Sequence, residues 1–396
     1  MIYLDWASTT PADPDILAEA ARIAVENYGN PSSSHDLGRA AHARLEEARS
    51  KVFALLGKGA ASGSLAFTGS GTEADGIPLL ALLRKAAKDG SSPHVVLTEI
   101  EHSAIYEEAA VLRSLGIAST IVRPGTDGRI RPEAVVAALK PETELVCVMA
   151  VNNETGAVQP IAEIAKALAE SAARLGKRRP RLHVDAVQAL GKIAFESAAL
   201  GVDSAAFSAH KFRGPRGSGA LWLARGLEPL VVGGGQEGGL RPGTESLQSA
   251  WAFAAAAELA VTRLGERRAM ARRFEKRLIE GLSEAGCLPL PLGRKSGDEA
   301  YSPFILSVAF PGITGEVLVR ALAAGDAAAP GGIAVSTGAA CNANAHRKGR
   351  RILEAMGLDP ALSLSAIRVS TGELTKDEEI EAFISAATAL HRRLRA

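Results

Sequence analysis

A lysine and an aspartate stand at the ends of two apolar runs in the middle of the chain. Asp185 ends the run Leu182 to Asp185, and Lys211 ends the segment Phe207-Ser-Ala-His-Lys. Because ligands of open α/β sheets bind beyond the carboxyl ends of the strands, both side chains can face one crevice. An amine can form a Schiff base, and a carboxylate can keep a pyridine nitrogen protonated. A structural ion pair would use the same two residues, so their types and positions alone leave both interpretations open.

A glycine cluster lies at a predicted strand-to-helix junction. The segment Thr68-Gly-Ser-Gly-Thr-Glu-Ala-Asp places Gly71 and Thr72 where the first N–H groups of a helix lack intrahelical partners. These donors, the helix dipole and the Thr72 hydroxyl favour a phosphate group. The pattern Gly69-x-Gly71-x-x-Ala74 also fits a dinucleotide fingerprint, and a plain tight turn is the third alternative. A phosphate cradle, an amine and a carboxylate together are what pyridoxal phosphate requires.

The chain has three cysteines, of which Cys341 is the candidate nucleophile. It lies in a run of small residues, Ala334-Val-Ser-Thr-Gly-Ala-Ala-Cys-Asn-Ala-Asn-Ala-His, which predicts an accessible, mobile loop. An unreactive loop thiol is the alternative. Cys147 is predicted to be a core residue, and Cys287 shows no partner. Without a Cys-x-x-Cys spacing we expect no disulfide framework, no metal site and a reducing, cytoplasmic setting.

Three further polar residues follow or interrupt predicted strands. His102 could stack on an aromatic cofactor, relay a proton or cap the next helix. Asn153 could bind a ring substituent or start a turn. Arg368 lies in the apolar segment Ala-Ile-Arg-Val-Ser, where burial requires a partner. A substrate carboxylate and a protein carboxylate would satisfy its guanidinium equally well.

Composition excludes several classes of protein. The 396 residues are 47% apolar and 22% charged, with 45 Lys and Arg against 44 Asp and Glu. That balance argues against a dedicated nucleic-acid binder and against a disordered acidic tail. The most apolar long stretch, Ala250 to Val261, carries Glu258 and is shorter than the about 20 residues of a membrane span. The N-terminus has Asp5 where an export signal would be apolar, so we expect a protein without membrane association.

Short apolar runs alternate with longer helical patterns, which predicts an α/β domain with a mostly parallel sheet covered by helices on both faces. A long helical pattern then runs from about 246 to 285 and leads to a smaller α+β unit. We predict a large domain at 15–255 and a small domain formed by 1–14 and 256–396. The predicted strands are 64–68, 94–98, 145–151, 182–185, 204–207, 219–223, 305–310 and 366–370, and the predicted helices include 73–88, 104–115, 161–175 and 315–323.

Taken together, these segments resemble the cysteine desulfurases, which belong to the fold-type I pyridoxal-phosphate enzymes related to class V aminotransferases. The likeness extends from Tyr3-Leu-Asp-Trp-Ala-Ser-Thr-Thr-Pro to Ser365-Ala-Ile-Arg-Val-Ser. Its most specific pieces are His183-Val-Asp-Ala-Val-Gln, Ser208-Ala-His-Lys, Arg241-Pro-Gly-Thr and Val335-Ser-Thr-Gly-Ala-Ala-Cys. The resemblance implies a large domain with a seven-stranded type of sheet, and a small domain that carries the cysteine loop.

The resemblance also implies roles for individual residues. Lys211 would carry pyridoxal phosphate as a Schiff base, His102 would stack on its ring and move protons, and Cys341 would attack the substrate sulfur. Arg368 and Asn153 would bind the substrate. The implied cofactor-binding set is Gly71, Thr72, His102, Asn153, Asp185, Gln188, Ser208, His210 and Lys211, with Thr244 reaching in from the second subunit of a homodimer.

The implied reaction converts L-cysteine into L-alanine and leaves a persulfide on Cys341 for a sulfur-acceptor protein, as in iron–sulfur cluster assembly or tRNA thiolation. Selenocysteine lyase, a related aminotransferase, a nicotinamide dehydrogenase and a non-catalytic relay subunit are the alternatives. The sequence departs from the family pattern at Gly76, where asparagine is usual, and in the basic segment after Cys341. These departures leave the choice of acceptor open.

Overall fold

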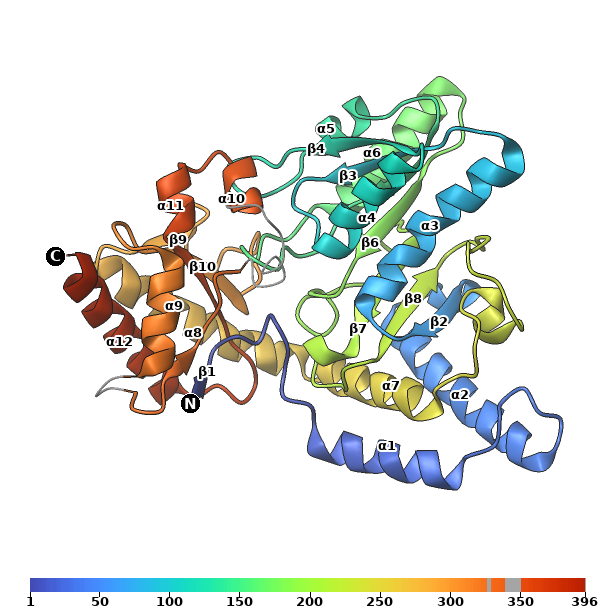
Figure 1. Ribbon diagram of the computed structural model, residues 1–396, viewed down its shortest axis with the longest axis horizontal. Coiled ribbons are helices and arrows are strands. Elements are labelled where there is room, and N and C mark those ends of the chain that lie inside the picture. The colour runs from blue at the N-terminus through green and yellow to red at the C-terminus, as the bar shows by residue number, and fades with distance from the viewer. Residues whose placement is uncertain (326–328, 339–349, 396) are drawn as a thin grey trace.

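A computed structural model describes residues 1–325, 329–338 and 350–395 of the chain. Figure 1 shows two regions of regular structure, each built on a sheet of its own, with helices α7 and α8 connecting them. The N-terminal strand β1 lies in the smaller region, and the helix that follows it, α1, lies against the larger one. Both regions contribute to the candidate site described below.

The larger region contains a seven-stranded sheet with the order β2-β8-β7-β6-β5-β3-β4. Strand β8 is antiparallel to its two neighbours, and every other pairing in this sheet is parallel. The predicted mostly parallel sheet is therefore confirmed. Its strands are β2 (Ser64–Thr68), β3 (His94–Thr98), β4 (Ala118–Val122), β5 (Thr143–Cys147), β6 (Arg181–Asp185), β7 (Ser204–Ser208) and β8 (Gly219–Leu223).

Helices cover both faces of this sheet, as expected for strands that are apolar on both sides. On one face α3 and α4 pack against β3 and β5 through residues such as Leu79 and Ile105. The other face carries the larger core, to which α1, α2, α5, α6 and α7 contribute. The helices are α1 (Pro14–Glu26), α2 (Asp36–Leu55), α3 (Gly71–Asp89), α4 (Ser103–Ser114), α5 (Pro132–Ala137), α6 (Ile161–Leu175) and α7 (Leu247–Thr262), with short 3-10 turns η1 (Ala60–Ser62), η2 (Ala209–Lys211) and η3 (Gln236–Gly239).

The smaller region contains an antiparallel three-stranded sheet with the order β12-β10-β9. A short parallel pair, β1 with β11, joins the N-terminal segment to it. Helices α8, α9 and α12 form a separate apolar core with this sheet around Phe274, Phe310 and Phe383. The elements are β1 (Ile2–Tyr3), α8 (Leu264–Glu284), β9 (Leu288–Leu290), β10 (Ile305–Ala309), α9 (Gly315–Ala324), β11 (Ile333–Ala334), α10 (Arg351–Ala355), α11 (Pro360–Leu364), β12 (Ala366–Ser370) and α12 (Asp377–Arg395).

The single long helix predicted over 246–285 is wrong, because the chain breaks at Arg263 into α7 and α8. Helix α7 packs with the larger core as far as Ala260, whereas α8 packs with the smaller core. The buried Arg267 guanidinium spans the break, since its Nη1 donates to the carbonyl of Ala260 at 3.2 Å and to that of Gly191 at 2.8 Å. The chain must bend between α7 and α8 because the two helices pack with different cores, and the spacing of apolar residues in the sequence does not reveal this bend.

Other differences between prediction and structure are small. Strand β5 ends at Cys147 rather than at Val151, yet the chain beyond it still donates from Val148 and Ala150 to carbonyls at the end of β6. Cys147 is fully buried, as predicted. Strand β4, at the sheet edge, was not predicted. None of the helices in the described ranges has the length and apolar character needed to cross a membrane.

Candidate active site

A cavity of about 650 Å³ lies beyond the carboxyl ends of the parallel strands. The N-terminal segment at Ala7 to Thr9 and strand β12 of the smaller region close it. This is the edge at which an α/β sheet holds its ligands. Most predicted site residues line this one cavity, namely Gly71, Thr72, His102, Asn153, Asp185, Gln188, Ser208, His210, Lys211 and Arg368.

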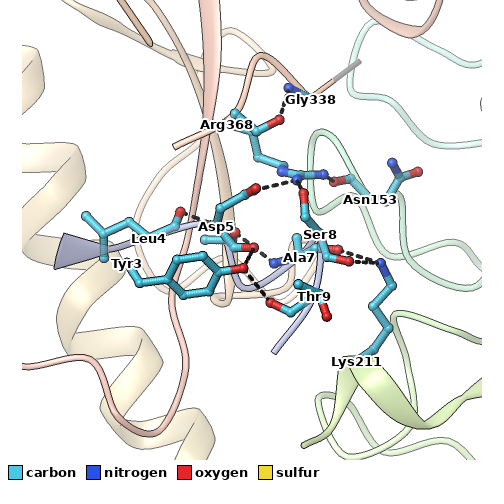
Figure 2. Close-up of polar contacts among 12 residues, drawn as sticks. Tyr3, Leu4, Asp5, Ala7, Ser8, Thr9, Asn153, Lys211, Gly338 and Arg368 are labelled. Atoms are coloured by element: carbon cyan, nitrogen blue, oxygen red, sulfur yellow. Dashed lines mark hydrogen bonds and ion pairs between the residues drawn. The ribbon is translucent and has the colours of Figure 1, made fainter. Parts of the chain in front are cut away.

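The Lys211 amine is held at the cavity wall by the N-terminal segment. It lies in the η2 turn directly after β7, and its Nζ donates to the carbonyl of Ala7 at 2.8 Å and to that of Ser8 at 2.7 Å (Figure 2). Since both acceptors are backbone oxygens, the position of the amine depends on the path of the chain at 7–8. The amine therefore faces the cavity from a fixed wall.

Asp185 ends β6 and is 5% exposed. Its Oδ1 accepts from the Val187 N–H at 2.9 Å. Burial raises the pKa of this carboxyl, while His102, the Val187 N–H and Lys211 act in the opposite direction. A buried carboxylate in such surroundings gains most from a cationic partner, and a protonated pyridine nitrogen is a partner of that kind.

His102 caps a helix, which confirms one of the alternatives raised by the sequence, and it also lines the cavity, where stacking on a cofactor and proton relay stay predictions. Its Nδ1 accepts from the Ala104 N–H at 3.2 Å at the start of α4. Because a backbone N–H can only donate, the neutral ring carries its proton on Nε2. The cap thus fixes both the orientation and the tautomer of a ring that faces the cavity.

The N-terminus of α3 forms the phosphate end of the site. Ser70 caps this helix, its Oγ accepting from the Glu73 N–H at 3.0 Å. A Cβ added to Gly71 would lie 2.8 Å from Cγ2 of Val187 and 3.2 Å from Cβ of Ser208, so only glycine fits without displacement. Burial and the neighbouring Lys211 lower the pKa of His210 to about 3, which keeps that imidazole neutral. Neutral donors and helix N–H groups suit a dianion without a full counter-charge.

The dinucleotide interpretation of the Gly69 to Ala74 pattern is wrong. Such a fingerprint opens the helix between two neighbouring parallel strands. Here the strand before the pattern, β2, is an edge strand that pairs only with antiparallel β8, and the strand after α3, β3, lies on the far side of the sheet. The junction is a helix N-terminus without the βαβ unit that binds a dinucleotide.

Of the two partners that the sequence left open for Arg368, the structure shows the protein carboxylate, and the contact with a substrate carboxylate stays a prediction. It is 3% exposed and lines the cavity, while its Nη2 bonds to Asp5 Oδ1 at 2.7 Å and to Ser8 Oγ at 2.7 Å (Figure 2). Its Nη1 donates to the backbone carbonyl of Asn153 at 2.8 Å. A protein carboxylate thus holds a guanidinium that also faces the cavity. These contacts orient the fork-shaped donor set before any ligand arrives.

Two predicted residues are not placed in this cavity. Thr244 is exposed and outside the lining, and its predicted contact from a second subunit stays a prediction. Cys341 lies outside the described residues, so its role also stays a prediction. Gly338, close to it in sequence, lines the cavity.

Sequence reasoning missed several residues that line the cavity, among them Ser8, Asp75 and Arg216. Asp75 is buried on α3, and its Oδ1 lies 3.1 Å from Nε2 of His183. Burial raises the pKa of Asp75 well above its usual range and lowers that of His183 to about 3. The signal available in the sequence was helical spacing, because Asp75 follows Gly71 by one turn and shares its face.

The residues present fit pyridoxal phosphate. Asn153 Oδ1 is buried with no hydrogen-bond partner among the described residues. This is expected of a polar atom whose hydrogen-bond partner is a ligand. The α3 N-terminus provides a cradle that a Cβ would fill. The amine and the carboxylate are the two groups that an aldehyde and a pyridine nitrogen require. Within the described part of the chain, no group of three or more His, Cys, Asp or Glu side chains is arranged to hold a metal ion.

Comparison with known proteins shows the family of the chain. The model of the family described as aminotransferase class-V matches residues 2–383. The chain is 35% identical over 386 residues to Cysteine desulfurase IscS of Anaeromyxobacter sp. (strain K), covering 96% of this chain and 90% of that protein. A solved NifS-like protein has a TM-score of 0.86 at 32% identity and covers 99% of this chain and 100% of its own. Another, described as SspA in complex with cysteine, has a TM-score of 0.75 at 26% identity, covering 94% of this chain and 99% of its own.

Proposed function

Because the chain belongs to the class-V aminotransferase family, we propose that it is a pyridoxal-phosphate-dependent cysteine desulfurase. The observation that carries this proposal is the convergence of Lys211, Asp185 and Arg368 on one cavity. An amine for the aldehyde, a carboxylate for the ring nitrogen and a guanidinium for a substrate carboxylate are what a pyridoxal enzyme acting on an amino acid needs.

Residues that end or follow strands β2, β3, β6 and β7 would hold the cofactor. The first N–H groups of α3, with Thr72, Ser208 and His210, would bind its phosphate. Asp185 would pair with the ring nitrogen, and His102 would cover the ring. Support for these roles comes from the common lining of the cavity and from the cap that orients His102.

Arg368 would bind the carboxylate of L-cysteine. Asp5 and Ser8 bond to Nη2 and the Asn153 carbonyl bonds to Nη1, so the guanidinium plane is fixed from two sides. The second N–H of Nη1, which these contacts leave over, would bond to the α-carboxylate of an amino acid, and the positive charge of the guanidinium favours such an anion. The Asp5 carboxylate also offsets part of the cost of burying this cation while the site is empty of substrate.

Bound pyridoxal phosphate supplies an electron-withdrawing ring that stabilises negative charge on the substrate carbons. Lys211, released from the carbonyls of Ala7 and Ser8, and His102 are the groups placed to move protons near those carbons. The Cys341 thiol then accepts the substrate sulfur. L-cysteine and the enzyme thiol give L-alanine and an enzyme persulfide, a balanced transfer that needs no external oxidant or reductant.

The finer assignments are that the enzyme is a cytoplasmic homodimer and that it supplies sulfur to an acceptor protein, for example in iron–sulfur cluster assembly. The dimer is supported by exposed apolar residues beside the site. Val231 and Val232 are 59% and 65% exposed, and Val231 lines a second cavity that shares Ser70 and Thr72 with the first. The predicted contact of Thr244 from a second subunit would need a second copy on this side of the site, and Thr244 is exposed as such a contact requires. Gel filtration of the active enzyme at the monomer mass would contradict the dimer.

The test of the proposed function uses the purified chain with pyridoxal phosphate and L-cysteine. We expect a visible absorption band that is absent in Lys211→Ala, and alanine formation that stops in Cys341→Ala while the band remains. Cys287→Ala is the matched control, because Cys287 is buried in the smaller core, away from the cavity.

Full L-cysteine turnover in Cys341→Ala would disprove the persulfide step. Amino transfer to a keto acid without sulfur release would instead identify an aminotransferase. Faster turnover of selenocysteine, retained in Cys341→Ala, would identify a selenocysteine lyase.

A further inference from the structure

Lys192 is a buried lysine that the proposed mechanism does not use. It is 4% exposed, and its Nζ donates to Gln188 Oε1 at 2.5 Å, the one hydrogen bond that its amine makes within the described residues. A compact turn after β6 brings the two residues together, because Leu190 bonds back to the carbonyl of Ala186 and Ile193 to that of Ala189. A lysine amine without a carboxylate partner is costly to bury, so its position calls for an explanation.

The neighbours of this amine make its burial less favourable still. The charged groups with the largest effect on it are Lys211, Arg267 and Arg368, and all three are cations. Burial first, and these cations second, lower the pKa of Lys192 well below its usual range. Arg368 and Arg267 are paired with Asp5 and Glu373, whereas Lys192 makes no ion pair among the described residues, so the bond to Gln188 is its one polar contact there.

Gln188 is the residue that Lys192 constrains. Its side chain lines the cavity, and its Nε2 donates to the carbonyl of Ala7 at 2.9 Å. A backbone carbonyl can only accept, and the Lys192 amine donates to the oxygen on the other side. Both contacts therefore require the same orientation of the amide, with Oε1 toward Lys192 and Nε2 toward Ala7. The second N–H of Nε2 takes part in neither of these two bonds.

We propose that Lys192 is a positioning residue that fixes the Gln188 amide so that it offers the cavity an N–H donor and not its carbonyl oxygen. This inference rests on the proposed function and on the place of Gln188 in the implied cofactor-binding set, where the resemblance gives its amide the phenolic oxygen of pyridoxal phosphate as partner. That oxygen is anionic in the bound cofactor, so an N–H stabilises it and an amide oxygen in the same place repels it. Lys192 acts on the cofactor through Gln188 without touching it.

The Ala7 carbonyl shows why one contact alone does not fix the amide. It accepts both from Gln188 and from Lys211. When Lys211 leaves the carbonyls of Ala7 and Ser8 to bind the cofactor, the N-terminal segment loses two of its bonds to the larger region. The Lys192 contact is made within a single turn of the larger region and is independent of that change.

The test is a comparison of Lys192→Met, Gln188→Ala and the double variant, each with pyridoxal phosphate. Methionine fills the space of the side chain as far as the Cε position of lysine and removes the donor. Loss of a hydrogen bond worth about 0.5–1.5 kcal/mol predicts a cofactor dissociation constant raised about three- to tenfold. We also expect the pH midpoint of the visible absorption band to move upward by roughly one unit in either single variant. The double variant should move no further, since both changes remove the same interaction.

Arg267→Met is the matched control. It removes a buried cation near Lys192 that makes no hydrogen bond to Gln188. If the pH midpoint of the visible band depends on the orientation of Gln188 and not on the total positive charge near Lys192, the midpoint in Arg267→Met stays at the wild-type value. An equal shift in Arg267→Met would overturn the proposal in favour of a simple charge effect.

Two other results would overturn it. One is a Lys192→Met titration that coincides with the wild type, and the other is a double variant whose shift is the sum of the single shifts. If Lys192→Met does not fold, Lys192→Gln takes its place, because glutamine is one bond too short to reach Gln188 and predicts the same upward shift. A wild-type chain that develops no visible band would refute the proposed function, a result distinct from these.

Discussion

Gly71→Ala tests whether the close packing at the α3 N-terminus is what holds the cofactor phosphate. The added Cβ would lie 2.8 Å from Cγ2 of Val187 and 3.2 Å from Cβ of Ser208, whereas carbon atoms in contact stay about 3.5–4.0 Å apart. One of the two walls must therefore move by several tenths of an ångström to an ångström. Overpacking of this kind costs about 1–3 kcal/mol.

The strain from the added Cβ destabilises the cofactor-bound protein more than the free protein. Without the cofactor, the first turn of α3 can shift outward and relieve the contact. With the phosphate bound, the N–H groups of Gly71 and Thr72 must stay in place. We expect the dissociation constant for pyridoxal phosphate to rise by about 5- to 100-fold, since about 1.4 kcal/mol corresponds to a factor of ten.

The assay is a titration of the apoprotein with pyridoxal phosphate, followed by the visible band. Gly265→Ala is the matched control, because Gly265 also lies in the first turn of a helix and a Cβ there meets nothing within 4 Å. An unchanged dissociation constant in Gly71→Ala, with the control also unchanged, would refute the role of this contact. A loss of affinity in both variants would show a general effect of the substitution.

Three further predictions concern the substrate, pH and packing. Arg368→Lys replaces the planar guanidinium that Asp5 orients with an ammonium group. We expect KM for L-cysteine to rise about tenfold or more, while the absorption band of the cofactor stays unchanged. Burial raises the pKa of Glu101 to about 7, so the folded state keeps a proton that the unfolded state loses above its value of 4.5, and stability falls as pH rises through this window. Glu101→Gln should remove that loss and unfold at higher denaturant concentration than the wild type at pH 8, but not at pH 4. A Cβ on Gly372 would overlap the Trp6 ring, so Gly372→Ala should lose about 1–3 kcal/mol of unfolding free energy; an unchanged thermal midpoint would contradict this.

The part of the site that could be predicted from sequence lies at the ends of apolar strands. Asp185 and Lys211 were recognisable because strand ends of a parallel sheet converge on one edge, and each follows a short, mostly apolar run. The Gly71 junction was recognisable from a glycine cluster between a strand and a helix. Each of these signals is local in the sequence.

The contacts that could not be predicted are made by backbone atoms or join distant segments. The carbonyls of Ala7 and Ser8 hold Lys211, and a carbonyl gives no sign in the residue type that carries it. The pairing of Asp5 with Arg368 joins the two ends of the chain. The break at Arg263 was missed because both helices keep an apolar pattern, and only their packing partners differ.

The N-terminal segment that closes the cavity has a consequence for how the protein is made on the ribosome. The Ala7 N–H donates to Oγ of Ser370, and Nη2 of Arg368 donates to Oγ of Ser8. The residues of the N-terminal segment can therefore make these bonds only after residues near the C-terminus have been synthesised. At 5–20 residues per second the delay is roughly 20–70 s, during which the large sheet can form without its finished ligand pocket. The wall of the cavity formed by residues 7–8 is therefore fixed in place only after strand β12 has been synthesised.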